Sequence, residues 1–269
     1  MTLIVGAVAY DPKVVTIWDG FQEYFETRGL ELDYILFSNY ERQVEAHFAG
    51  VIHVAWNSPL AWVRSERRAA ALGRKAEAIA MRDTDRELTS LVVVGTDSKI
   101  HSVADLKGKR VAVGAKDSPQ ATLIPLSFLA RKGLDPGVDF EFVPFDRLVG
   151  KHGDHIGGER DAVRALVSGV ADAACILDGN HLLFRQEGTI PSGATRILAQ
   201  TPAYDHCNFT ILDDAPAAQV ARFRELLLEM KYSDAAVRPL LDLEGLKAWL
   251  PGRTQGYAAL AEAVDRFEK

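Results

Sequence analysis

Hydrophobic positions along this chain recur with two different spacings. Short apolar runs rich in Val, Ile and Leu are typical of strands, whereas apolar residues at every third or fourth position are typical of helices. Strands are expected over residues 3–10, 32–37, 51–56, 76–81, 88–95, 110–116, 140–145, 172–177, 195–200 and 208–212. Helices are expected over residues 11–27, 40–48, 119–132, 159–167, 178–187, 216–230, 233–241, 244–250 and 255–267, with another that begins at Ser58. Because strands separated by such helices pair in parallel through right-handed crossovers, the pattern predicts an α/β fold.

Two of these helix starts carry clear signals. Ser58 precedes Pro59, so a capping side chain stands before a proline at the first helical position. Asp117 or Ser118 stands in the same way before Pro119. The second start follows a strand, so its free N–H groups would face outward beyond the strand's carboxyl end, where small polar ligands commonly bind. A binding site is therefore expected there.

Three stretches carry a recognisable pattern. Residues 97–114 read DSKIHSVADLKGKRVAVG and lead into a helix that ends in a GLDP turn, residues 54–59 read VAWNSP, and residues 160–175 read RDAVRALVSGVADAAC. Together they resemble the solute-binding proteins of ABC importers, and among them the phosphate, phosphite and phosphonate-binding group. The resemblance implies the two-lobed type 2 periplasmic-binding-protein fold, in which each lobe is a mostly parallel sheet flanked by helices and two strands form the hinge. It places residues 1–93 and 203–269 in lobe one, with the C-terminal helices, and residues 94–202 in lobe two.

The same resemblance implies a function. Such proteins capture a small polar molecule in the cleft between the lobes and present the closed form to an ABC permease or a sensor. Closure follows because the ligand contacts both lobes only in the closed state, which shifts the population toward that state. We therefore expect a monomeric receptor without a cofactor, whose ligand is phosphonate-like or amine-bearing.

Ligands of doubly wound α/β folds bind beyond the carboxyl ends of the strands, where loops and helix starts converge. The candidate ligand-binding residues at such positions are Tyr10, Asp11, Asn57, Ser58, Ser118, Gln120, Ala121, Thr122, His155, Glu159, Asp161, Asp178 and His206. The three candidates between 155 and 161 are included because the resemblance implies a contact from this stretch. Asn57 and the two serines also suit plain helix capping, and Tyr10 suits a position between core and solvent.

The helix start at Ser118 limits the charge of the ligand. Phosphonate-binding members usually present a run of Ser and Thr there, whereas residues 117–122 of this chain read DSPQAT. One hydroxyl position is Gln, another is Ala, and Asp117 adds a carboxylate. A fixed negative charge within about 5 Å of a dianion is unfavourable by several kcal/mol at low effective dielectric. The run therefore argues against phosphate or phosphonate.

A polar cluster in residues 151–161 also argues against a phosphate or phosphonate ligand. Its acidic and imidazole side chains suit binding a cation, accepting hydrogen bonds from an amine, or coordinating a metal. The members are His152, Asp154, His155, Glu159 and Asp161. Their spacing matches no zinc signature, so no metal is expected.

Residues 204–208 read YDHCN. Adjacent residues of an extended segment point to opposite faces, so the side chains of His206 and Cys207 are not expected to meet, and Cys207 is not expected to be a nucleophile. His206 or His181 is a candidate acid or base.

The alternative function is a cytoplasmic enzyme on the same fold, similar to menaquinone-pathway enzymes, thiamine-pyrimidine synthases and dihydroxyphthalate decarboxylases. Its acid–base groups would be His155, Glu159, Asp178 and His206. The receptor is preferred because no nucleophile–base pair or cofactor motif stands out.

Composition narrows the partners and the compartment. The chain has 269 residues, 48% of them hydrophobic, and a formal net charge of −6 without a basic patch, so no nucleic-acid partner is expected. No run reaches the roughly 18 apolar residues of a membrane span. The two cysteines are expected to be free thiols. Because the first strand starts at residue 3, the protein would be cytoplasmic if Met1 is the native start, and periplasmic or on the cell surface if a signal peptide has been removed.

Overall fold

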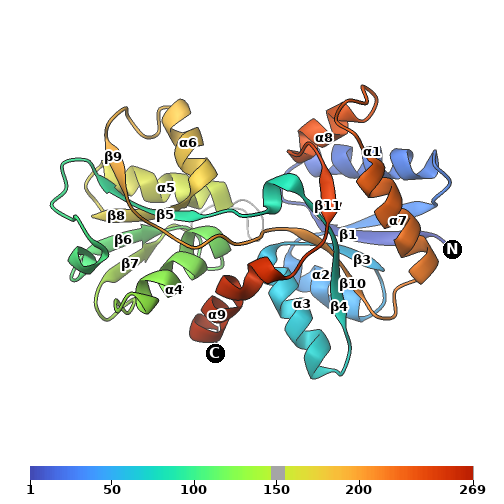
Figure 1. Ribbon diagram of the computed structural model, residues 1–269, viewed down its shortest axis with the longest axis horizontal. Helices are drawn as coiled ribbons and strands as arrows, with labels where there is room; N and C mark the ends of the chain where they lie inside the picture. The colour runs from blue at the N-terminus through green and yellow to red at the C-terminus, as the bar shows by residue number, and fades with distance from the viewer. Residues whose placement is uncertain (147–154, 269) are drawn as a thin grey trace. The chain divides into compact units, whose positions relative to one another are not determined.

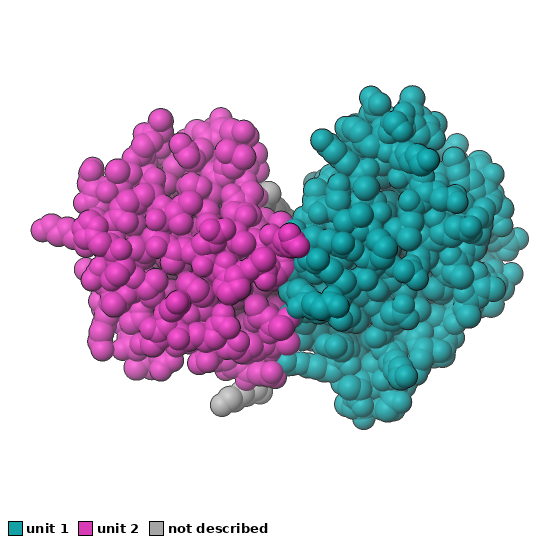
Figure 2. All heavy atoms as spheres, in the orientation of Figure 1, with its two compact units in different colours: residues 1–86, 205–257 teal, residues 87–204, 258–269 magenta. Residues whose placement is uncertain are grey.

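The computed structural model describes residues 1–146 and 155–268, and for residues 155–157 it describes the backbone alone. The chain divides into two compact units (Figure 2). Unit 1 comprises residues 1–86 and 205–257, and unit 2 comprises residues 87–204 and 258–269. Each unit has its own sheet and its own hydrophobic core.

The sheet of unit 1 has the strand order β11-β4-β10-β3-β1-β2 (Figure 1). Its strands are β1 (Leu3–Val8), β2 (Leu32–Phe37), β3 (Val54–Asn57), β4 (Ala76–Arg82), β10 (Asn208–Leu212) and β11 (Trp249–Pro251). Its helices are α1 (Lys13–Glu26), α2 (Tyr40–Phe48), α3 (Pro59–Ala71), α7 (Ala217–Glu229) and α8 (Arg238–Glu244). Strand β1 pairs in parallel with β2 and β3, whereas β10 is antiparallel to both β3 and β4. The returning strand β10 therefore makes this a mixed sheet.

An aromatic cluster forms the core of unit 1. Helix α1 buries Trp18, Phe21 and Phe25, because its apolar residues recur at helical spacing. The ring of Phe25 stacks on that of Phe223 with centroids 4.8 Å apart, which holds α1 against α7. Trp62 of α3 is also buried.

The sheet of unit 2 has the strand order β7-β6-β8-β5-β9. Its strands are β5 (Ser90–Gly95), β6 (Arg110–Val113), β7 (Glu141–Pro144), β8 (Ala173–Leu177) and β9 (Thr195–Gln200). Its helices are α4 (Ile124–Arg131), α5 (His155–Val167), α6 (Asp178–Gln186) and α9 (Ala258–Phe267). Strand β6 is parallel to β7 and β8, whereas β5 is antiparallel to β8 and β9. Both sheets are thus α/β layers with antiparallel additions.

The core of unit 2 lies on both faces of its sheet. Alternate residues of β5 belong to opposite sides: Val92 and Val94 pack in one cluster, and Leu91 and Val93 in the other. Helices cover both faces, so the strand reads as a continuous apolar run. Cys175 of β8 is buried in the first cluster. Both cysteines are free thiols, as predicted.

The structure corrects three expectations. The helix expected over residues 244–250 is absent: Gly245, with φ of 78°, ends α8, and Trp249 pairs with Arg82 as part of the edge strand β11. The helix expected from Pro119 begins with a π-helical turn, Pro119–Leu123, and only then continues as α4. The C-terminal helix α9 (Figure 1) was expected in lobe one, but it belongs to unit 2. There, Arg131 of α4 forms an ion pair with Glu262 at 3.2 Å.

No helix in the described ranges is both long and apolar enough to cross a membrane.

Candidate functional site

The helix start after β6 is built by close backbone approach. Gly114 makes it possible, because a Cβ there would lie 2.8 Å from the Cβ of Ala121. Ser118 is buried, and its hydroxyl accepts a hydrogen bond from the Ala121 N–H at 3.2 Å. Thr122 donates from its hydroxyl to the carbonyl of Ala115 at 2.7 Å. The capping role expected of Ser118 is therefore present, and the hydroxyl of Thr122 is used inside the unit.

A buried amide and a buried carboxylate meet behind this helix start. Glu159 of α5 is fully buried, and its carboxylate accepts hydrogen bonds from the Gln120 side chain at 3.2 Å, the Leu177 N–H at 2.8 Å and the Asn180 side chain at 3.0 Å. Ser90 donates to the Gln120 carbonyl and lies 2.7 Å from the hydroxyl of Tyr204. We call Ser90, Gln120, Glu159, Asn180 and Tyr204 the amide cluster.

Within the described part of the chain, the side-chain oxygen of Gln120 in the amide cluster has no partner. The side-chain oxygen Oε1 of Gln120 is buried and accepts no hydrogen bond from any residue that the structure describes. The side chain cannot be turned over to relieve this, because Oε1 would then face the carboxylate of Glu159 in place of Nε2. Gln120 therefore holds a fixed acceptor that is ready for an N–H or O–H donor.

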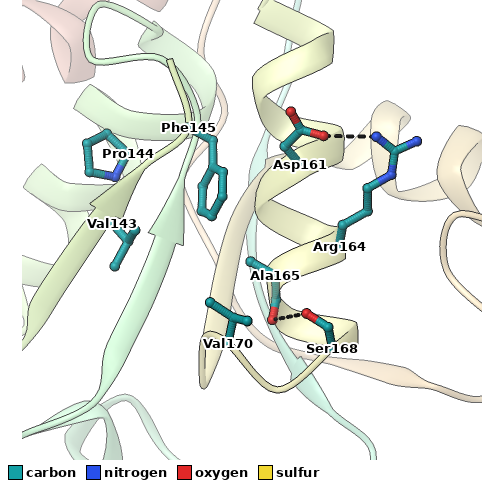
Figure 3. Close-up of a pocket in the computed structure, with 8 residues that line it drawn as sticks. All are labelled: Val143, Pro144, Phe145, Asp161, Arg164, Ala165, Ser168 and Val170. Atoms are coloured by element: carbon teal, nitrogen blue, oxygen red, sulfur yellow. Dashed lines mark hydrogen bonds and ion pairs between the residues drawn. The ribbon is translucent and has the colours of Figure 1, made fainter. Parts of the chain in front are cut away.

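The other candidates of unit 2 have hydrogen-bond partners of their own or lie outside the described side chains. Asp178 begins α6 and accepts hydrogen bonds from Thr89 and from the Gly179 N–H, each at 2.7 Å. Asp161 pairs with Arg164 at 2.9 Å and lines a mainly apolar groove of about 610 Å³ between β7 and α5 (Figure 3). His155 is the first residue of α5, but its side chain, together with His152 and Asp154, lies outside the described residues.

In unit 1, three of the candidates serve the local fold. Asn57 is fully buried; it donates to Thr210 at 2.9 Å and accepts from Gln43 at 2.8 Å. Ser58 caps α3 by accepting from the Ala61 N–H at 3.2 Å, as predicted. Asp11 accepts from the N–H of the first residue of α1 at 2.9 Å. These polar atoms are therefore engaged within unit 1.

A group of charged side chains lies where β4 ends and β10 begins. Arg82 binds both carboxylate oxygens of Asp85, at 2.5 and 2.9 Å, and reaches the Glu244 carboxylate at 3.2 Å. His206 Nδ1 lies 3.4 Å from Asp85 Oδ1 and 3.1 Å from Cys207 Sγ. We call Arg82, Asp85, His206, Cys207 and Glu244 the ionic cluster.

The charge states of the ionic cluster follow from these contacts. Burial alone would raise the pKa of Asp85, but Arg82 and His206 lower it to about 2. Burial alone would lower the pKa of His206, but Cys207 and Asp85 raise it to about 10. Tyr10 lies two residues after β1 and is 39% exposed; the partial burial of its ring and the nearby Glu244 raise its pKa to about 12. At neutral pH, Asp85 is therefore a carboxylate and His206 an imidazolium.

The prediction that the side chains of His206 and Cys207 do not meet is wrong, because the two side chains touch. The reason is that both residues precede β10, outside the regular pleat. Arg82, Asp85 and Glu244 were not predicted as site residues. The available signal was the arginine that ends the strand at 76–82 and the two aspartates, Asp83 and Asp85, that follow it.

A family comparison assigns this architecture. Residues 5–257 match the model of a family described as the periplasmic substrate-binding protein of a phosphonate ABC transporter. The chain belongs to this family. It is thus a substrate-binding protein of the phosphonate-transporter type, which binds a small ligand for an ABC transporter. The resemblance stated from the sequence is confirmed.

Solved structures share the fold of this substrate-binding protein. PhnD1 from Prochlorococcus marinus, in complex with methylphosphonate, has a TM-score of 0.71 at 19% identity, covering 100% of this chain and 98% of that one. XAC2383 from Xanthomonas citri, bound to ATP, has a TM-score of 0.74 at 18% identity, covering 98% and 97%. A binding protein of an ABC phosphonate transporter from Pseudomonas aeruginosa has a TM-score of 0.62 at 15% identity, covering 98% and 94%. At these identities the likeness establishes the two-lobe fold.

Proposed function

We propose that this substrate-binding protein takes a small polar molecule that carries an amine, and that the amine donates to Gln120 in unit 2. The observation that carries the proposal is the buried Oε1 of Gln120, which has no partner among the described residues. A buried acceptor without a donor costs about 1–3 kcal/mol, and a ligand N–H that reaches it recovers this free energy. The remaining candidate positions, Tyr10, Ser118 and Asp178 among them, stay predictions.

The charge around Gln120 supports a donor-bearing ligand. Its amide is fixed by the buried carboxylate of Glu159, so a group bound to Oε1 lies one amide away from that negative charge. Like unit charges about 6 Å apart repel by roughly 3 kcal/mol at an effective dielectric of 20, and an ammonium group gains by a similar amount. A dianionic phosphonate placed against Gln120 is therefore disfavoured, whereas an amine is favoured.

The amine does not specify the chemical group at the other end of the ligand. The relative from Prochlorococcus marinus was solved with methylphosphonate, which has no amine. A molecule with both groups, such as an aminoalkylphosphonate, would suit the family and would also supply the donor. We therefore expect the amine to distinguish the ligand of this protein from a simple alkylphosphonate.

Matched ligand pairs test the proposal. Each pair differs only in the amine: 2-aminoethylphosphonate against ethylphosphonate, and taurine against ethanesulfonate. Titration calorimetry should give a dissociation constant at least tenfold lower for the amine-bearing member of a pair, and that member should raise the melting temperature, since a ligand at one hundred times its dissociation constant adds about 2.7 kcal/mol. Equal affinities within both pairs, or no binding by any amine in the panel, would refute it. Chromatography of the same mixtures shows whether the ligand is consumed, which would favour the enzyme hypothesis.

A further inference from the structure

The ionic cluster brings together three different metal-ligating groups. Asp85, His206 and Cys207 each offer one ligand atom, and these atoms all lie within 4.8 Å of one another. Asp85 and Cys207 are buried, and the His206 side chain keeps an exposed fraction of 22%. The group is therefore enclosed, yet it can be reached from solvent along the imidazole.

The distances suit a single tetrahedral ion. Zinc binds Cys sulfur at about 2.3 Å, His nitrogen at about 2.0–2.1 Å and carboxylate oxygen at about 2.0–2.2 Å, so its ligand atoms lie roughly 3.3–3.6 Å apart. His206 Nδ1 lies 3.1 Å from Cys207 Sγ and 3.4 Å from Asp85 Oδ1. The Asp85 and Cys207 ligand atoms lie within 4.8 Å of each other, so side-chain rotation has to bring this third pair to the tetrahedral distance.

The candidate ligands are held from behind. Arg82 donates to both carboxylate oxygens of Asp85, and such outer hydrogen bonds orient ligating carboxylates in known metal sites. The backbone N–H of His206 donates to the Asp85 carbonyl at 2.8 Å, and Tyr257 donates to the His206 carbonyl at 2.8 Å. Arg82 is thus a positioning residue, and the two ligand-bearing segments are tied together.

Charge balance also favours a dication. Two carboxylates, Asp85 and Glu244, already contact the single guanidinium of Arg82. Ligation requires Cys207 as the thiolate and His206 as the neutral imidazole. A divalent cation among these groups would leave the cluster electrically neutral.

We propose that Asp85, His206 and Cys207 form a three-ligand site for a zinc-like divalent cation, whose fourth ligand comes from outside these side chains. A thiolate, an imidazole and a carboxylate are the ligands that zinc prefers, and Mg²⁺ and Ca²⁺ avoid sulfur. This site lies in unit 1 and does not involve Gln120.

Cobalt serves as the spectroscopic probe. Chelator-treated protein is titrated with Co²⁺ alone, and one equivalent should produce a thiolate-to-cobalt charge-transfer band together with intense tetrahedral d–d absorption. Zn²⁺ should then displace the cobalt in a one-to-one ratio. The band should disappear in Cys207→Ala and persist in the matched variant Cys175→Ala, since Cys175 is buried in the sheet of unit 2. Affinity for Zn²⁺ should fall by more than 100-fold in Cys207→Ala, beyond the roughly 10–100-fold loss typical of outer hydrogen-bonding partners.

Two results would overturn the site. One is wild-type protein that gives no charge-transfer band and binds less than one Zn²⁺ per chain. The other is a band that persists in Cys207→Ala. His206→Gln provides a second measurement should Cys207→Ala fail to fold, and an unchanged Zn²⁺ affinity in that variant counts against the proposal. Because no organic ligand is present, the outcome is independent of the amine test.

Discussion

The two polar clusters of this protein stabilise buried carboxylates in different ways. The ionic cluster of unit 1 offsets buried charge with opposite charge: Arg82 lies between Asp85 and Glu244. The amide cluster of unit 2 surrounds the Glu159 carboxylate with hydrogen bonds from the side chains of Gln120 and Asn180 and a backbone N–H. Removing one partner of a buried ion pair lowers the free energy of unfolding strongly, whereas removing one of several hydrogen-bond donors to a buried carboxylate lowers it less. Unit 1 should therefore govern stability, and unit 2 should govern ligand choice.

The largest effect is expected from Arg82→Met. The variant removes the guanidinium that Asp85 and Glu244 share and leaves Asp85 with His206 alone, and breaking a buried pair costs about 3–5 kcal/mol. Urea unfolding measures the loss. Arg42→Met is the matched control, because Arg42 and Glu45 form an exposed pair whose side chains are 71% and 58% accessible. It should cost no more than about 1 kcal/mol. Similar losses in the two variants would remove the contrast between charge pairing in unit 1 and surface pairing.

An intermediate effect is expected from His47 of α2, also in unit 1. Burial lowers the pKa of His47 from 6.5 to about 4. Above pH 6.5 the ring is neutral in the folded and unfolded states alike. As the pH falls toward 4, His47 becomes protonated in the unfolded chain but stays largely neutral in the native state. The free energy of unfolding therefore falls.

Replacing His47 tests where the acid sensitivity lies. Between pH 6.5 and 4, the wild type should lose about 2–3 kcal/mol more than His47→Met, as measured by urea unfolding at each pH. His101→Gln, at an exposed position in unit 2, should behave as the wild type does. Parallel stability curves for the wild type and His47→Met would contradict the prediction.

The smallest effect is expected from Gln120→Met, and it concerns affinity. Methionine has nearly the same volume but offers no acceptor. Binding of an amine-bearing ligand should therefore weaken by about 10–100-fold, which corresponds to the free energy of one hydrogen bond with a charged donor. Titration calorimetry measures the change. Gln186→Met at the exposed end of α6 should leave affinity unchanged. If Gln120→Met binds the amine as tightly as the wild type, the amine is received elsewhere.

Elements whose hydrogen bonds are local could be predicted from the sequence. The strand Leu32–Phe37 and the helix Tyr40–Phe48 have the expected bounds, because their spacing of apolar residues is set by the element itself. The Ser58 cap depends on neighbouring residues and was also predicted. Gln120 was named as a candidate from its place after a strand. Its unpartnered oxygen could not be foreseen, because Glu159 is distant in sequence and fixes the amide.

The sequence alone determined the alternating strands and helices, the family motifs and the capped helix starts, since each depends on contacts within a few residues. Tertiary structure alone decided the ionic cluster. Its members come from three segments that meet only because the sheet order places β4 between β11 and β10. Glu244 precedes β11, Arg82 ends β4, and His206 and Cys207 precede β10. Ion pairs between such distant residues follow from strand order, which no local pattern of hydrophobic and polar positions encodes.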